Sequence, residues 1–207
     1  NRHPCFDLCF ISHYRPELVA RDRSSLFRLI DENQKFLFQF LSYYASSHNL
    51  SLAVVCKTRE TKLQTTEKKY FTSISQTKSF EFIRTDNGSS EFNSYLTALS
   101  SDLIVNPAST LGFELFSAGK MVLFGASTDP ALIQLWGIQH YFNALPTLVK
   151  LIGHNYDEFC EHCDRLRGMT ISQYLEVTQK AAATIVAMPD SEYPHETVKR
   201  LISNILA

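Results

Sequence analysis

Residues 101–127 hold the side chains whose types and spacing best suit ligand chemistry. They read S-D-L-I-V-N-P-A-S-T-L-G-F-E-L-F-S-A-G-K-M-V-L-F-G-A-S. The apolar run L-I-V predicts a strand buried on both faces, and Pro107 breaks it. Ser109 and Thr110 are residues typical of a helix start, and Gly119 is typical of a helix end. The segment therefore predicts a strand, a tight turn, a helix and a further strand, M-V-L-F.

The start of this helix predicts an anion site. The first amides of a helix have no acceptor within it, and the helix dipole favours negative charge there, most often a phosphate. Ser109 and Thr110 lie at this position, with Asn106 just before them at the end of the strand. Glu114 lies one turn into the helix, within reach of a ribose hydroxyl beside the phosphate. We therefore expect the functional cleft here.

The composition indicates a folded protein with a full core. Of 207 residues, 44% are hydrophobic and 20% are charged, and the length suits one large domain or about one and a half. The net charge of −1 provides no basic surplus for nucleic acid. No apolar run approaches the roughly 20 residues of a membrane span, and no signal peptide pattern opens the chain. We expect a cytoplasmic protein and, since the chain begins without methionine, a fragment of a longer one.

The cysteines predict no disulfide framework. Their number is odd and their spacing irregular, at Cys5, Cys9, Cys56, Cys160 and Cys163. The C-E-H-C sequence at 160–163 contains three side chains that bind zinc, but a structural site needs a fourth ligand, usually from a second close pair. Cys9 belongs to an apolar run, where cysteine acts as a small hydrophobe. We favour helix packing over metal or redox chemistry and expect neither a metal nor a cofactor.

Apolar periodicity predicts five strands that alternate with helices. The strands are expected at 6–12, 50–56, 80–83, 103–105 and 121–124. Helices are expected from Ser24 or Ser25 to Asn49, within 57–74, and over 91–99 and 109–119. This alternation predicts an α/β doubly wound parallel sheet, and right-handed crossovers favour the strand order 3-2-1-4-5.

The pattern changes beyond Ser127. No strand signal follows, and three helices are expected at 156–167, 171–186 and 192–206, with Gly168 as a stop and Ser172 as a cap. We therefore predict a Rossmann-like domain over 1–150, with residues 151–207 as helices that pack on the same domain.

The predicted topology leads to the same site. In the order 3-2-1-4-5 the first and fourth strands are neighbours, and ligands bind at the carboxyl ends where the winding reverses. His13 and Arg15 follow the first strand there, opposite the turn at 106–110. Other cations near strand ends are Lys57, Arg59 and Arg84. The candidate catalytic groups within the chain are His13, Asp86, Asp129 and His140.

The block from Asp102 to Phe124 resembles the donor-binding half of GT-B glycosyltransferases, nearest to bacterial surface-polysaccharide transferases that include CMP-Kdo and CMP-sialic acid enzymes. The resemblance in architecture covers 6–127. It implies that Ser109 and Thr110 hold the nucleotide phosphate and that Glu114 binds the ribose. It also implies a CMP-sugar donor first and a UDP-sugar next, with transfer to a surface polysaccharide or lipopolysaccharide.

The same resemblance implies partners. They are a nucleotide sugar, a glycan acceptor, and an N-terminal acceptor domain or partner chain that supplies the catalytic base. Peripheral association of the full-length protein with the inner face of the membrane would follow. Two alternatives stay open, a UDP-sugar epimerase of the same fold and a non-catalytic scaffold. The chain contains no G-x-G-x-x-G, G-x-x-x-x-G-K-S/T or G-x-S-x-G, which disfavours NAD enzymes, P-loop NTPases and α/β-hydrolases.

Overall fold

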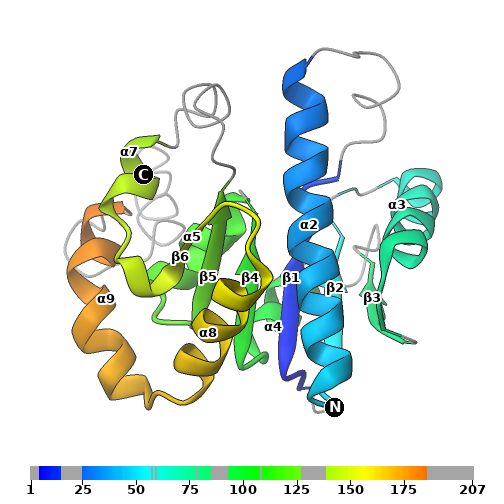
Figure 1. The fold of residues 1–207 in the computed structure, drawn as a ribbon. Helices are drawn as coiled ribbons and strands as arrows, with labels where there is room; N and C mark the ends of the chain where they lie inside the picture. The colour runs from blue at the N-terminus through cyan, green and yellow to red at the C-terminus, as the bar shows by residue number, and fades with distance from the viewer. Residues whose placement is uncertain are drawn as a thin grey trace, which may run out of the picture.

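The computed structural model describes residues 5–14, 25–56, 58, 60–77, 79–84, 93–107, 109–126 and 139–185. Within these ranges six parallel strands form one sheet in the order β3-β2-β1-β4-β5-β6 (Figure 1). The strands are β1 (Leu8–Ile11), β2 (Leu52–Val55), β3 (Glu81–Ile83), β4 (Leu103–Asn106), β5 (Val122–Ala126) and β6 (Lys150–Ile152).

Helices cover both faces of this sheet (Figure 1). They are α2 (Ser25–Ser47), α3 (Thr61–Ile74), α4 (Asn93–Leu99), α5 (Thr110–Ser117), α7 (Gln139–Ala144), α8 (Tyr156–Arg167) and α9 (Ile171–Ile185), with a 3₁₀ turn η1 (Thr147–Val149). Helices α2 and α8 pack on one face, with α3 against α2. Helices α4 and α5 pack on the other, with α9 against α5. The doubly wound α/β sheet predicted from sequence is confirmed, and its order 3-2-1-4-5 continues into a sixth strand.

The expectation of no strand beyond Ser127 is wrong, because β6 pairs in parallel with β5. Its three residues, K-L-I, are too few to show a strand periodicity. Only Leu151 of the three is fully buried, as expected at the edge of a sheet. Pairing with β5, through partners such as Gly125 and Leu151, creates this strand. It therefore depends on tertiary contact rather than on a local signal.

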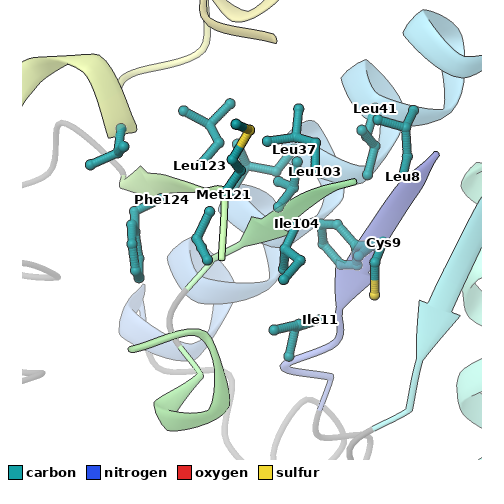
Figure 2. Close-up of a cluster of buried hydrophobic side chains, with 14 of the residues drawn as sticks. Leu8, Cys9, Ile11, Leu37, Leu41, Leu103, Ile104, Met121, Leu123 and Phe124 are labelled. Carbon is teal, nitrogen blue, oxygen red and sulfur yellow. The ribbon is translucent and has the colours of Figure 1, made fainter. Parts of the chain in front are cut away.

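The central strands carry the core. Every residue of β1 and β4 is buried, as a parallel sheet covered on both faces requires. Figure 2 shows buried side chains from β1, β4, β5 and α2 gathered in one cluster. On the α2 side, the ring centroid of Phe38 lies 5.3 Å from that of Phe10 and 4.8 Å from that of Phe71. These edge-on aromatic contacts join β1, α2 and α3.

Two helix ends form as predicted. Asn49 follows α2 with a φ of 54°, and Gly119 follows α5 with a φ of 80°. In both, the next residue donates its N–H back to the last turn of the helix, Leu50 to the Ala45 carbonyl and Lys120 to the Leu115 carbonyl. The left-handed backbone that these bonds require suits asparagine and glycine.

The cap predicted at Ser172 is wrong, because Thr170 starts α9. The Thr170 hydroxyl accepts the N–H of Gln173, and the Gln173 side chain accepts the N–H of Thr170. This is a reciprocal capping box, in which a polar side chain on the third helical residue makes the earlier position the better cap. Ser172 lies inside the helix. The helix predicted at 192–206 lies outside the described residues.

The C-E-H-C sequence lies in α8, as predicted. Cys163 is fully buried, and burial raises the pKa of its thiol. His162 faces the 3₁₀ turn instead, with Nδ1 2.9 Å from the Leu148 carbonyl oxygen. Among the described residues, no cluster of three or more His, Cys, Asp or Glu is arranged to hold a metal ion. The same part of the chain contains no helix with the length and hydropathy to cross a bilayer.

Phe38→Ala tests the aromatic packing. Phe38 is fully buried, so we expect the substitution to lower the free energy of unfolding by about 3–5 kcal/mol through lost burial and a cavity. Phe36 on the same helix is 38% exposed, so Phe36→Ala should cost about 1 kcal/mol or less. Urea unfolding followed by circular dichroism measures both changes. Equal losses in the two variants would contradict this assignment of the core.

Candidate functional site

The turn between β4 and α5 is built around the buried side chain of Asn106. Its Oδ1 accepts the N–H of Ser109 at 2.9 Å, and its Nδ2 donates to the Ser109 carbonyl at 3.0 Å. Both polar ends of the amide are therefore bound to one backbone residue. A buried amide needs such partners, so the last residue of β4 fixes the position at which α5 begins.

Gly112 makes room for this arrangement. A Cβ atom at Gly112 would lie 2.0 Å from Asn106 Nδ2 and 2.7 Å from Asn106 Cβ. Real side chains never approach so closely, so the amide can lie under α5 only because residue 112 is glycine. Asn106, Ser109 and Gly112 thus form one packed unit.

The first turn of α5 carries the donors predicted for an anion. Ser109 occupies the N-cap position with an extended backbone, as predicted, but its hydroxyl makes no capping bond. The amides of Thr110 and Leu111 have no acceptor within the helix, because they belong to its first turn. Glu114 lies one turn later on the face of Thr110, and its partial burial raises the pKa of its carboxyl. The turn therefore places amides, a hydroxyl and a carboxylate close together.

The carboxyl end of β1 lies next to this turn, because β1 and β4 are neighbouring strands and the winding of the sheet reverses between them. Strand β1 pairs with β2 on one side and with β4 on the other. His13 follows β1, and its N–H donates to the side-chain oxygen of Gln34 in α2. The structure thus brings His13 to the same edge of the sheet as Asn106.

Helix α2 supplies polar residues that the sequence analysis missed. Asn33 Nδ2 donates to the Gly125 carbonyl at the end of β5, at 3.4 Å. Asn33 Oδ1 lies 3.2 Å from Nε2 of His154, so that nitrogen is the donor. The His154 ring stacks on Phe36 at 4.3 Å. Asn33 and Gln34 interrupt the apolar face of α2 as an adjacent polar pair, and that interruption is the signal that could have identified them.

A second polar group lies between α2 and α3, beside Tyr14. The Tyr14 and Tyr70 rings stack at 4.3 Å. Burial raises the pKa of Asp31, an effect partly offset by the Tyr70 hydroxyl beside it. Burial and the Asp31 carboxyl together raise the pKa of Tyr70. Nearby, the fully buried Glu67 accepts the Thr58 hydroxyl at 3.0 Å and so holds the loop after β2.

Arg84 is not brought into this arrangement. It is exposed at the end of β3, an edge strand that β2 and β1 separate from β4. The backbone of His140 belongs to α7. The remaining predicted residues, Arg15, Lys57, Arg59, Asp86 and Asp129, lie outside the described residues. Their roles stay predictions, as does every ligand contact assigned to Ser109, Thr110, Glu114, Asn106 and His13.

A family model described as "putative O-antigen biosynthesis protein" matches residues 8–141, which is more than half of the chain. The chain belongs to this family. The matched region begins at the first residue of β1 and includes the β4–α5 turn. The matched region therefore includes both sides of the candidate site. A comparison with curated proteins finds no match.

The chain is also similar to a solved structure, the crystal structure of AviGT4, a glycosyltransferase involved in avilamycin A biosynthesis. The identity is 13% and the TM-score is 0.39, and the alignment covers 96% of this chain and 49% of that chain. The chain thus spans about half the length of that glycosyltransferase.

Gly112→Ala tests the turn. The new methyl group would displace the Asn106 side chain and break both of its bonds to Ser109, so we expect a loss of about 2–4 kcal/mol in the free energy of unfolding. The control is Gly168→Ala, where the nearest atom would be a carbonyl oxygen at 3.2 Å. That variant should lose about 1 kcal/mol or less. Chemical unfolding measures both.

A double variant sharpens this test. In an Asn106→Ala background the amide is already absent, so Gly112→Ala should cost less than it does in the natural chain. Strict additivity of the two losses would show that the two residues do not act through each other.

Proposed function

We propose that this chain is the donor-binding part of a glycosyltransferase that uses a nucleotide-activated sugar. The observation that carries the proposal is the β4–α5 turn. There Asn106 fixes the start of α5 beside the point where the winding reverses between β1 and β4. Membership in the O-antigen biosynthesis family supports it, because a polysaccharide is assembled by sugar transfer from activated donors.

In this proposal the nucleotide phosphate lies at the start of α5. The amides of Thr110 and Leu111 and the Ser109 hydroxyl donate to its oxygens, while Asn106 positions the turn from below. His13 and Arg15 approach the phosphate from the end of β1. Glu114 accepts a hydrogen bond from the ribose, one helical turn from the phosphate.

The chemical step is the exchange of one bond at the anomeric carbon. The bond from that carbon to the phosphate oxygen breaks, and the electron pair stays on the departing nucleotide. An acceptor hydroxyl forms the new bond and loses its proton to a base. Donors fixed at the start of α5 stabilise the charge that develops on the phosphate, and we propose that they do so without a metal ion. The base would be His13, Asp86 or Asp129, or a group from a second domain.

The finer assignments are part of the same proposal. We favour a CMP-sugar donor such as CMP-Kdo, with a UDP-sugar next, and a surface polysaccharide or lipopolysaccharide as the acceptor. An N-terminal domain or partner chain would bind that acceptor, and the full-length protein would associate peripherally with the cytoplasmic face of the membrane.

Calorimetric titration with CMP, UDP and GDP tests the proposal. We expect preferential binding of one nucleotide and about tenfold weaker binding by Ser109→Ala, because one hydrogen bond to a charged phosphate is lost. The control is Ser117→Ala in the same helix. The Ser117 hydroxyl is buried without a hydrogen-bond partner, so its removal should leave nucleotide affinity unchanged.

The alternatives give different results in the same experiments. Turnover of a UDP-sugar without any acceptor would favour an epimerase. A folded chain that binds no nucleotide, even with the proposed acceptor-binding domain or partner chain added, would contradict the proposal and favour a scaffold.

A further inference from the structure

A groove lies at the amino-terminal edge of the sheet, opposite the carboxyl edge that contains the β4–α5 turn. Its volume is about 600 Å³, within the usual range for small-ligand sites. It lies between the end of α2 and the loop that leads into β3. The lining residues at the strand starts are Phe6 before β1, Leu52 at the start of β2, and Phe80 and Glu81 at the start of β3.

The groove has an apolar floor and a polar rim. Phe6, Ala45 and Leu52 form the floor and are buried. The rim consists of exposed side chains with hydroxyl, amide and carboxylate groups, namely Ser46, Asn49, Ser51, Ser79 and Glu81. A sugar ring has the matching character, because its carbon-bound hydrogens form apolar faces and its hydroxyls form a polar edge. The lining is thus suited to a saccharide.

The described groups that line the groove carry negative rather than positive charge. The groove adjoins the C-terminal end of α2, a helix of 23 residues whose last carbonyls carry the negative end of its dipole. Glu81 adds a carboxylate on the rim. Asp7 lies beside the rim, where two hydrogen bonds from Ser51 and, more weakly, the positive charge of Arg167 lower the pKa of its carboxyl and keep it ionised. These groups accept hydrogen bonds, so the complementary ligand carries hydroxyl donors and no negative charge.

We propose that this groove binds a neutral saccharide. It is a separate site from the β4–α5 turn, where the helix start presents N–H donors that favour an anion. The two edges of the sheet therefore recognise opposite kinds of ligand. Binding of the saccharide requires no nucleotide, and only its further assignment, as a non-reacting part of the acceptor glycan, rests on the proposed transferase function.

The test is an NMR titration of the ¹⁵N-labelled chain with four neutral oligosaccharides, built from galactose, glucose, mannose and rhamnose. At least one should shift the amide signals of Ser46, Asn49 and Ser79 saturably at millimolar concentration. Ser46→Trp places a large side chain in the groove and should weaken this binding by about tenfold or more. The control, Ser47→Trp, alters the next exposed residue of α2, which does not line the groove, and should leave affinity within about twofold.

A charged sugar tests the ligand class. 3′-Sialyllactose is lactose with an added carboxylate, so it should bind more weakly than lactose. Saturable shifts by none of the neutral sugars, equal or tighter binding of 3′-sialyllactose, or an equal loss in Ser46→Trp and Ser47→Trp would each overturn the proposal. Nucleotide binding is followed separately at the Ser109 and Thr110 amides, so failure of one proposal does not decide the other.

Discussion

The structure depends on burying β1 and β4 on both faces. All eight residues of these two strands are buried, and seven of them are apolar. Strands of this kind need helices above and below, which parallel crossovers provide. Because every strand runs in the same direction, the chain leaves the sheet at one edge and enters it at the other. One edge therefore presents helix starts near strand ends, and the opposite edge presents helix ends near strand starts.

Buried side-chain amides fix the positions of loops at the ends of the strands. Asn106 holds the start of α5, while Asn33 and Gln34 tie α2 to the ends of β5 and β1. A buried amide without partners is costly, so each of these side chains favours one loop geometry. None of them needs to contact a ligand to matter for binding. They determine where the amides of Thr110 and Leu111 and the backbone of His13 lie.

Strong local signals made most of the fold predictable. The run L-I-V before Pro107, the glycine at 119 and the asparagine at 49 mark element ends through backbone geometry alone. The predicted order of strands is confirmed because right-handed crossovers leave few alternatives. The sixth strand was missed because K-L-I becomes a strand only by pairing with β5. The cap at Thr170 was missed because the side chain of Gln173 decides between two neighbouring hydroxyl residues.

For the candidate site, the sequence by itself determined the strand–turn–helix at 103–117 and the residue types at its start, since proline, N-cap and apolar spacing act over a few neighbours. Only the tertiary structure decided that Asn106 faces inward under Gly112, that His13 is held by Gln34, and that Asn33 and His154 meet near the end of β5. These contacts join residues far apart in the chain or depend on the close approach of a side chain to a helix backbone. Local propensity carries no information on these two kinds of contact, because both arise from how the helices pack on the sheet.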